Sequence, residues 1–302
     1  MPMHDQKTSP ACVPRAGKLL RTSLAVLMLI GAATSAWAKP HTNHRALYHH
    51  DPYRRSAAAY AIVVDGNLLW GRNLDAHREP ASLTKLLTAL VLLDSNWQPD
   101  AVLTVSRDAA HTTPVRVGLH TGDRVRAEDA LTAMLMHSAN DACMVLVEHA
   151  AGTLAAFAAR MNARAAQLGM HDSHFVHPCG YDAAGQYSTV HDLLRLAETA
   201  HADPRIARIV EQRRASITTE GGRRLTFNST NHLLGHMPGV VGLKTGYTAQ
   251  AGRCLIALAE RSGHRVWVVL LDSHQRWWVA PRMLASGFAA AAREHTHIVA
   301  GT

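Results

Sequence analysis

The chain has 302 residues, with 31 lysine and arginine residues against 23 aspartate and glutamate residues, and a formal net charge of +8. This length is enough for one sizeable hydrophobic core, in one or two lobes. A basic protein suits an anionic partner such as a wall polymer or a membrane surface. No basic run carries interleaved aromatic residues, which argues against nucleic acid.

Residues 1–38 have the features of a secretory signal peptide. Lys18 and Arg21 precede an apolar stretch from Leu24 to Ala33, and Ala36-Trp37-Ala38 is a small-x-small cleavage site. The apolar stretch is short for a membrane span, so an uncleaved anchor is the weaker alternative. The signal peptide predicts export across the inner membrane, to the periplasm or cell envelope.

Residues 39–56 are polar and basic and are predicted to form a flexible linker. The linker contains His41, His44, His49 and His50. A histidine-rich tract can bind metal, but a solvated leader ahead of the fold is the preferred interpretation.

Of the four cysteines, Cys12 falls in the signal peptide, which leaves Cys143, Cys179 and Cys254. An odd number in an oxidising compartment allows one disulfide with a free thiol, or three buried thiols. No CxxC or HExxH pattern occurs. The sequence therefore gives little support to a zinc site.

The first predicted elements after the linker are a β-hairpin and a helix. Tyr60–Val64 and Leu68–Trp70 are rich in strand-forming residues, with an Asp65-Gly66-Asn67 turn between them. A helix with a single apolar face is then expected, because apolar residues recur with helical spacing at Leu83, Leu86, Leu87, Leu90 and Val91.

Helices and then strands follow along the chain. Helices are expected at Arg126–Met136, from an N-cap at Asn140 or Asp141 to about Gly152, at Leu154–Leu168, and from about Thr189. Late strands are expected at Val240–Tyr247, Cys254–Glu260 and Arg265–Leu271, with a Ser262-Gly263 turn and a weak alanine-rich helix at the end. This order predicts an α+β fold: one antiparallel β-sheet with flanking helices beside a helical lobe, and a site in the groove between them.

Ser82 and Lys85 form an SxxK pattern at the start of the first predicted helix. Residues three apart share a helix face, so the amine of Lys85 can reach the hydroxyl of Ser82 and, when neutral, take its proton. A lysine in a first turn opposes the helix dipole, which suggests a functional reason for it. The alternative is that Ser82 is only an N-cap, and SxxK alone is a weak signal.

Two further triplets carry candidate chemistry. Ser138-Ala139-Asn140 lies between two predicted helices, where a hydroxyl can relay a proton and an amide can bind a peptide group, although both residue types are also common caps. Lys244-Thr245-Gly246 lies in a predicted strand and offers an anion site, although an edge strand also uses a protective lysine. A second S-x-N triplet, Ser229-Thr230-Asn231, is set aside because no helix junction frames it.

The patterns SxxK, SxN and KTG occur in this order, a combination similar to that of penicillin-binding proteins and β-lactamases. On these motifs the sequence resembles the low-molecular-mass penicillin-binding proteins, the D-alanyl-D-alanine carboxypeptidase and endopeptidase family of serine peptidases. The resemblance covers roughly Ala57 to Phe288. Its segments are 81–85 (ASLTK), 138–142 (SANDA), 161–162 (MN), 168–170 (LGM), 187–189 (YST), 244–248 (KTGYT) and 251–252 (AG).

The resemblance implies a β-lactamase-like fold and an acyl-enzyme mechanism on peptidoglycan stem peptides. Ser82 would be the nucleophile, Lys85 the general base and Ser138 a proton relay. The substrate would be bound by Asn140, Lys244, Thr245 and Gly246, with an oxyanion hole from the backbone N–H groups of Ser82 and Tyr247. Burial and Lys244 would lower the pKa of Lys85.

The resemblance implies no metal or cofactor, and it makes β-lactam antibiotics covalent inhibitors. The catalytic domain is expected at residues 57–294, followed by a C-terminal tail at residues 295–302. Peripheral association with the wall or membrane surface is also expected. The short stretch after Phe288 and the segment Asn228–Leu234 look more like the endopeptidase branch, and carboxypeptidase action stays open.

Two alternatives accompany this interpretation. A class A-like β-lactamase would carry a glutamate in an E-x-x-L-N segment, and none lies between Asn140 and Lys244. A non-catalytic wall-binding or β-lactam-sensing module is disfavoured because all the named catalytic side chains are present. Trp267, Trp277 and Trp278 are expected to pack in the core or groove, while Arg276 is a weak candidate for substrate contact.

Overall fold

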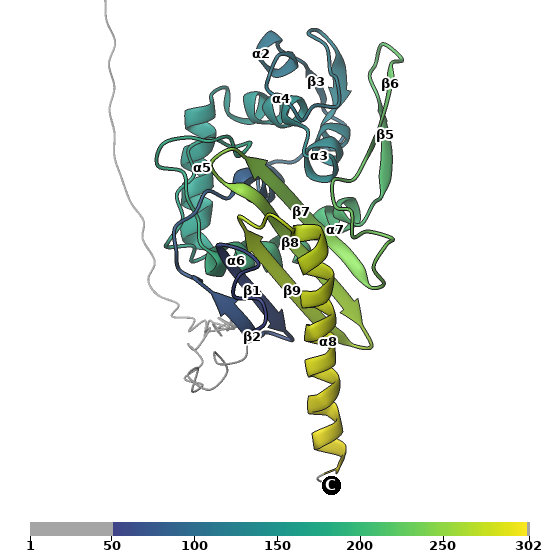
Figure 1. Ribbon diagram of the computed structural model, residues 1–302. Coiled ribbons are helices and arrows are strands. Elements are labelled where there is room, and N and C mark those ends of the chain that lie inside the picture. The colour runs from purple at the N-terminus through teal and green to yellow at the C-terminus, as the bar shows by residue number, and fades with distance from the viewer. Residues whose placement is uncertain (1–50, 301–302) are drawn as a thin grey trace, which may run out of the picture. The chain divides into compact units, whose positions relative to one another are not determined.

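The computed structural model describes residues 51–300 of the chain, with side chains for residues 51–293. The predicted signal peptide and the linker as far as residue 50 lie outside the described residues. The described part contains a five-stranded sheet, two small two-stranded sheets and a group of helices (Figure 1). This is the predicted α+β arrangement.

The main sheet joins strands from both ends of the described chain. Its spatial order is β2-β1-β9-β8-β7, and each neighbouring pair is antiparallel. The strands are β1 (Ala59–Val64), β2 (Asn67–Arg72), β7 (Val240–Thr248), β8 (Gly252–Arg261) and β9 (His264–Leu271). The predicted hairpin, the three late strands and the Ser262-Gly263 turn are confirmed.

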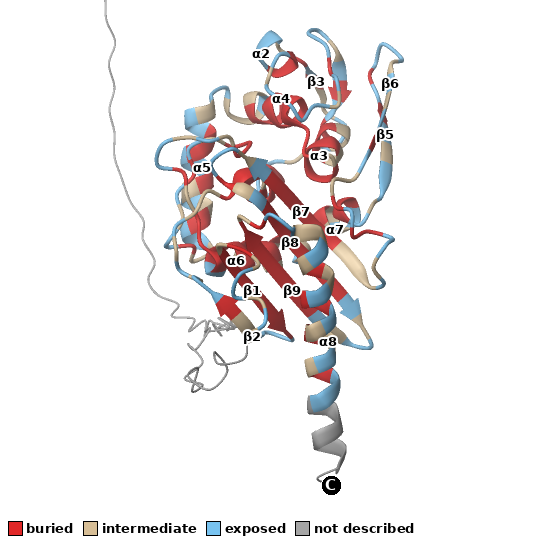
Figure 2. Cartoon of the chain, viewed as in Figure 1, coloured by how far each residue is buried: buried red, intermediate tan, exposed pale blue. Residues whose placement is uncertain are grey.

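The sheet is buried on both faces, because alternate residues of a strand point to opposite sides. Along β1, Tyr60 and Ile62 pack with Met283 and Leu284 of α8 (Arg276–Ala300). Ala61 packs in the larger cluster formed with the helical lobe. Figure 2 shows the consequence, with the central strands coloured as buried and α8 buried along one side only.

The remaining helices lie between the early and late strands of the main sheet. They are η2 (Ala81–Thr84, a 3₁₀ turn), α1 (Lys85–Leu93), α2 (Arg107–Ala110), α3 (Ala127–Met136), α4 (Asn140–Ala151), α5 (Leu154–Gln167), α6 (Val190–Ala202) and α7 (Pro204–Val210). The predicted helices are confirmed to within a few residues, whereas the short α2 and α7 were not expected.

Two small sheets were also not expected. They pair β3 (Val102–Thr104) with β4 (Arg124–Arg126), and β5 (Arg214–Thr218) with β6 (Arg224–Asn228). At the other end of the chain, the expected boundary between residues 294 and 295 falls inside α8. Of the helices in residues 51–300, none alone is long and apolar enough to cross a membrane, while α4 and α5 meet that criterion only as a pair bent by 86°.

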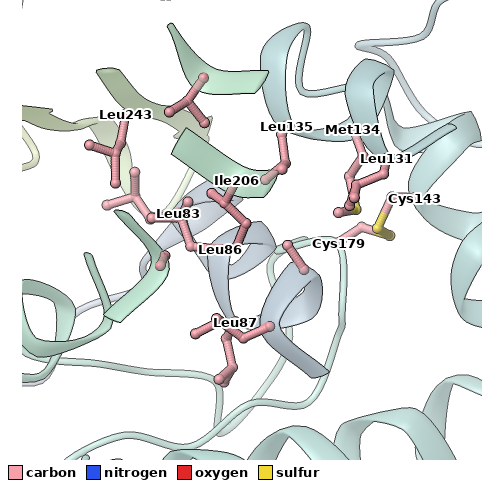
Figure 3. Close-up of a cluster of buried hydrophobic side chains, with 14 of the residues drawn as sticks. Leu83, Leu86, Leu87, Leu131, Met134, Leu135, Cys143, Cys179, Ile206 and Leu243 are labelled. Carbon is pink, nitrogen blue, oxygen red and sulfur yellow. A yellow bond between two sulfur atoms is a disulfide. The ribbon is translucent and has the colours of Figure 1, made fainter. Parts of the chain in front are cut away.

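Two local predictions are wrong. The first helix is not amphipathic: all of α1 except Val91 is buried, since α3, α4, α5 and α6 pack around it. Figure 3 shows Leu86 and Leu87 of this helix within the buried hydrophobic cluster. The N-cap of α4 is Ala139, not Asn140 or Asp141. Trp267 is buried as expected, while Trp278 is 71% exposed and lines a surface pocket together with Trp277.

Candidate active site

Ser82 lies in the 3₁₀ turn η2, and Lys85 is the first residue of α1. The capping positions of these helices belong to Pro80 and Thr84, so Ser82 is not a helix cap. Ala81, just before the serine, has a φ of 48°, in the left-handed region that non-glycine residues rarely adopt. The turn brings the Nζ of Lys85 within 3.1 Å of the Oγ of Ser82.

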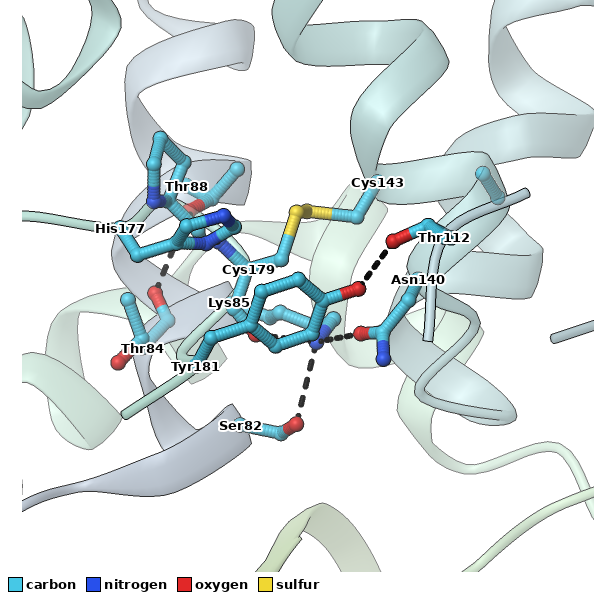
Figure 4. Close-up of a disulfide and its surroundings, with 12 residues drawn as sticks. Ser82, Thr84, Lys85, Thr88, Thr112, Asn140, Cys143, His177, Cys179 and Tyr181 are labelled. Atoms are coloured by element: carbon cyan, nitrogen blue, oxygen red, sulfur yellow. Dashed lines mark hydrogen bonds between the residues drawn. A yellow bond between two sulfur atoms is a disulfide. The ribbon is translucent and has the colours of Figure 1, made fainter. Parts of the chain in front are cut away.

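Lys85 is fully buried and meets three oxygen atoms. Its Nζ lies 2.8 Å from the Oδ1 of Asn140 and also donates to the backbone carbonyl of Cys179 (Figure 4). The Nδ2 of Asn140 donates to the carbonyl of Thr113, which fixes Oδ1 on the lysine side. Burial, and secondarily the charge of Lys244, hold the pKa of Lys85 well below its usual range.

The partners of Lys85 determine where its lone pair points. A neutral amine has two N–H donors and one lone pair, whereas a carbonyl or amide oxygen can only accept. When Lys85 is neutral, its two N–H groups therefore serve Asn140 and Cys179, and its lone pair is left for the hydroxyl hydrogen of Ser82 at the 3.1 Å contact. This is the arrangement required of a general base.

The α3–α4 junction brings Ser138 and Asn140 to the helical side of the site. Ser138 is buried and has a φ of 63°, again in the left-handed region. Within residues 51–293 its hydroxyl makes no hydrogen bond to Ser82 or Lys85, in contrast to Asn140. Asp141, the other expected cap, instead accepts from the backbone N–H groups of Val117, Gly118 and Leu119.

The KTG triplet lies on β7, at the edge of the main sheet. Lys244 and Thr245 are both buried, and the Nζ of Lys244 donates to the carbonyl of Thr245 at 3.1 Å. Burial and the charge of Arg276 lower the pKa of Lys244 to about 7. The Oγ1 of Thr245 lies 2.6 Å from the Oγ1 of Thr230.

Thr230 is a site residue that the sequence analysis missed. It belongs to the Ser229-Thr230-Asn231 triplet, which was set aside for want of a helix junction. The backbone N–H of Thr230 bonds to the carbonyl of Met136, at the end of α3, so this triplet does lie against a helix end. A second S-x-N pattern shortly before KTG was the available signal.

Gly246 allows the main sheet to approach the turn that carries Ser82. A Cβ atom at this position would lie 3.0 Å from the Cβ of Ala81 and 3.1 Å from the backbone nitrogen of Ser82. Only glycine therefore permits this approach without displacement. The next residue, Tyr247, has a 64% exposed side chain, and its backbone follows directly from this contact.

Arg276, at the start of α8, supports the KTG strand from behind. Its Nη1 donates to the carbonyls of Gly246 at 2.6 Å and Cys254 at 2.8 Å. It also borders a pocket beside the strand that includes three arginines and two tryptophans and no carboxylate: Arg253, His274, Gln275, Arg276, Trp277, Trp278 and Arg282. Arg276, the candidate for substrate contact, therefore lies against the backbone of the KTG strand.

The structure shows which of the cysteines form a disulfide, a question that the sequence left open. Cys143 of α4 and Cys179 form a disulfide, and Cys254 is a buried free thiol. Figure 4 shows the disulfide next to Lys85 and Asn140. Within residues 51–300, no group of three or more histidine, cysteine, aspartate or glutamate side chains is arranged to hold a metal ion.

A protein-family model described as D-alanyl-D-alanine carboxypeptidase matches residues 47–275. The chain belongs to this family. It is 36% identical over 233 residues to D-alanyl-D-alanine carboxypeptidase DacD of Salmonella typhimurium, covering 72% of this chain and 58% of the relative. It is 31% identical over 288 residues to the D-alanyl-D-alanine endopeptidase of Escherichia coli, covering 92% of this chain and 87% of the relative.

Among solved structures, penicillin-binding protein D2 from Listeria monocytogenes in its ampicillin-bound form superimposes with a TM-score of 0.69 and 32% identity. The match covers 79% of this chain and 100% of that one. The fold is therefore the β-lactamase-like fold of the family's DD-peptidases. The chain spans less than two thirds of the length of the DacD carboxypeptidases that it matches, 58% for the Salmonella typhimurium protein and 55% for the Escherichia coli protein.

Proposed function

We propose that this protein is a serine-type D-Ala-D-Ala carboxypeptidase or DD-endopeptidase that acts on peptidoglycan stem peptides through an acyl-enzyme on Ser82. The observation that carries the proposal is the buried Lys85, whose Nζ lies 3.1 Å from the hydroxyl oxygen of Ser82. Its lowered pKa favours the neutral amine, and its other partners leave the lone pair for that hydroxyl.

In the acylation step, the Oγ of Ser82 attacks the carbonyl carbon of the D-Ala peptide bond while Lys85 takes the hydroxyl proton. The developing oxyanion would be bound by the backbone N–H groups of Ser82 and Tyr247, each worth about 2.7–4 kcal/mol. Collapse of the tetrahedral intermediate breaks the C–N bond. The leaving amine receives a proton by way of Ser138, and the acyl group remains on Ser82 as an ester.

In the deacylation step, water attacks the ester carbonyl. Lys85 accepts a proton from that water, and the proton returns to the Oγ of Ser82 as the ester bond breaks. The products are the free D-Ala carboxylate and the restored serine, with one water consumed in the cycle. No redox step is needed.

Substrate binding is proposed for the two walls of the site. The Asn140 amide would hold the peptide backbone on the helical side. On the strand side, Lys244 and Thr245 would bind the substrate carboxylate, and Gly246 would permit its close approach. The pocket beside this wall contains three arginines, including Arg276, so this side of the site would favour anionic ligands.

A cell-envelope location is proposed together with this activity. The Cys143–Cys179 disulfide suits an oxidising compartment, and the peptidoglycan substrate lies outside the cytoplasm. The basic chain is suited to peripheral contact with anionic wall or membrane surfaces. The similarity to known proteins leaves both activities open, because the chain spans 87% of the E. coli endopeptidase and 92% of a Streptomyces carboxypeptidase.

Labelled penicillin tests the acyl-enzyme. The wild-type protein should gain one covalent adduct, mapped by mass spectrometry to the peptide containing Ser82, and Ser82→Ala should gain none. The Listeria relative in its ampicillin-bound form supports the choice of probe. Absence of an adduct on the wild type, or equal labelling of Ser82→Ala, would contradict the proposal. Nitrocefin turnover at rates on the order of 10 per second would indicate a β-lactamase instead.

Purified muropeptides then assign the bond. Monomers with a pentapeptide stem and cross-linked dimers are digested side by side, and the products are separated by chromatography. Release of D-Ala from monomers identifies a carboxypeptidase, and conversion of dimers to monomers identifies an endopeptidase. An unchanged mixture of both substrates would contradict both forms of the proposal.

A further inference from the structure

The disulfide Cys143–Cys179 connects the two residues that orient Lys85. Cys179 supplies one acceptor through its own backbone carbonyl. Cys143 lies one helical turn after Asn140, which supplies the other acceptor from the first residue of α4. The cross-link joins residues 36 apart in sequence, with Cα atoms 6.0 Å apart, and both cysteines are fully buried.

The loop that carries Cys179 has no secondary structure of its own at this point and depends on a few tethers. The Oγ1 of Thr88 on α1 donates to the carbonyl of Pro178 at 2.6 Å. The Oε1 of Gln186 accepts from the backbone of His177 at 2.8 Å. Gly180 lies so close to the nucleophile turn that a Cβ there would meet the carbonyl of Ala81 at 2.1 Å.

Hydrogen bonds hold the loop to α1, to Asn162 of α5 and to itself, and the disulfide ties it covalently to α4. The covalent tie to α4 matters because the lone pair of a neutral Lys85 is directed at Ser82 only while both acceptors, on the loop and on α4, keep their positions. An error of about 1 Å in a catalytic group can cost on the order of 100-fold in rate. A covalent link between the two acceptor segments limits their relative movement without touching substrate.

We propose that Cys143 and Cys179 are positioning residues for catalysis: their disulfide fixes the Cys179 carbonyl and the Asn140 amide relative to each other, and so aims the amine of Lys85 at Ser82. This inference rests on the proposed function and adds a redox requirement to it. The oxidised form is the competent one, so full activity needs an oxidising compartment.

The test is the double variant Cys143→Ala/Cys179→Ala, which keeps the backbone carbonyl at position 179 and removes only its tether. We expect the rate of acylation by penicillin at saturation to fall at least about 10-fold. The acid limb of its pH profile should move to higher pH. Burial is the largest cause of the low pKa of Lys85, and a loosened loop admits water.

The groups whose charges act with Lys85 are Lys244 on β7 and His177 in the loop. Burial and Lys85 together hold the pKa of His177 at about 4, so His177 is uncharged across the pH range of the assay. Lys244 is unchanged in the variant and contributes equally to both profiles. A shift between the two profiles therefore reports on the groups beside the disulfide, Lys85 and the loop residue His177, and not on Lys244.

Val147→Ala is the matched control. Val147 is a buried residue of α4 one turn beyond Cys143, so its truncation destabilises the same helix and leaves both acceptors tethered. It should lower the melting temperature and keep the wild-type acylation rate and pH profile. A purely structural disulfide would behave like this control, and that result in the double variant would overturn the inference.

Thr88→Val provides a second test, which is needed if the double variant does not fold. It keeps the disulfide and removes the hydrogen bond to the Pro178 carbonyl, so it should lower acylation in the same direction by a smaller factor. A loss in this variant as large as about 10-fold would show that the hydrogen bond, and not the intact disulfide, holds the carbonyl, and would overturn the inference. Failure of the proposed function is separate, because it would appear as an unlabelled wild-type protein.

Discussion

The two walls of the candidate site each bury a lysine, but they bury it differently. Lys85, on the helical wall, meets three oxygen atoms from three segments of the chain. Lys244, on the strand wall, makes one hydrogen bond within residues 51–293, to the carbonyl of Thr245. Both have lowered pKa values, chiefly because burial disfavours the charged form.

This difference separates two chemical roles. Lys85 has its two donors occupied and its lone pair directed at a hydroxyl, which suits proton transfer. Lys244 has donors to spare, with Arg276 close enough to lower its pKa, so an incoming anion would relieve an excess of positive charge. The proposed roles therefore place the base on the helical wall and anion binding on the strand wall, and each can be tested separately.

The largest effect is expected for Lys85→Met, which keeps the volume and removes the amine. Acylation of Ser82 by saturating penicillin should fall about 10²–10⁴-fold, because the general base is lost. Stopped-flow fluorescence with a labelled penicillin measures the rate. Circular dichroism checks that the fold persists. Acylation within about 10-fold of wild type would exclude Lys85 as the base.

Lys244→Met should affect binding more than chemistry. A hydrogen bond to a charged group contributes about 1.5–3 kcal/mol, so the KM for a peptide ending in free D-Ala carboxylate should rise about 10–100-fold. A peptide amide of the same sequence is the control and should lose little. Equal losses for the two peptides would mean that Lys244 does not bind the carboxylate.

The same variant should change how stability depends on pH. With a pKa of about 7 in the fold and 10.5 as its reference, Lys244 binds fewer protons folded than unfolded between these values. Its burial therefore costs most below pH 7, and the cost disappears as pH rises toward 10.5. Lys244→Met should be more stable than wild type by a few kcal/mol near pH 6, with the gap narrowing by pH 10.

Urea unfolding of both proteins at several pH values measures this gap. Other titrating groups contribute equally to the two proteins and cancel in the difference. A gap that stays constant from pH 6 to pH 10 would show that Lys244 keeps an ordinary pKa in the fold. The strand wall would then hold a permanently charged lysine.

The contrast between the walls also marks how far the sequence could lead. The contact of Lys85 with Ser82 and Asn140 could be predicted, because a three-residue spacing and a helix junction are local patterns in the sequence. The Cys179 carbonyl could not be found in this way, since every residue has one and only the folded loop selects it. Thr230 was missed for a similar reason, because only the packing of the folded chain against β7 brings it to its partner Thr245.

The same limits apply to the fold. The hairpin β1–β2 and the strands β7–β9 follow a clear turn-and-strand pattern, so they were predictable. The burial of nearly all of α1 was not, because an apolar stripe cannot reveal that Lys85 and Thr88 are also enclosed. The sheets β3–β4 and β5–β6 are short and carry exposed charged residues, which leaves little periodicity to detect.

Thr230→Val tests the missed contact on the strand wall. It removes the hydroxyl partner of Thr245, and a neutral hydrogen bond contributes about 0.5–1.5 kcal/mol, so KM for the carboxylate peptide should rise about 2–10-fold with kcat nearly unchanged. Thr226→Val is the control, since it breaks a comparable hydroxyl pair with Ser216 in the β5–β6 hairpin. If both variants behave alike, Thr230 has no role in binding.

The smallest effect is expected for Cys254→Ala, the strand-wall counterpart of the helical-wall disulfide. Cys254 pairs with Gly246 in the sheet, but burial raises its pKa to about 11, so it stays an unreactive thiol near neutral pH. Its truncation should leave the acylation rate unchanged and lower stability by about 1 kcal/mol or less. In the native wild type, iodoacetamide should not modify the Cys254 peptide, as mass spectrometry can check. Rapid modification, or a rate loss matching that of Cys143→Ala/Cys179→Ala, would mean that any cysteine near the site is sensitive, and that the two walls do not differ as described.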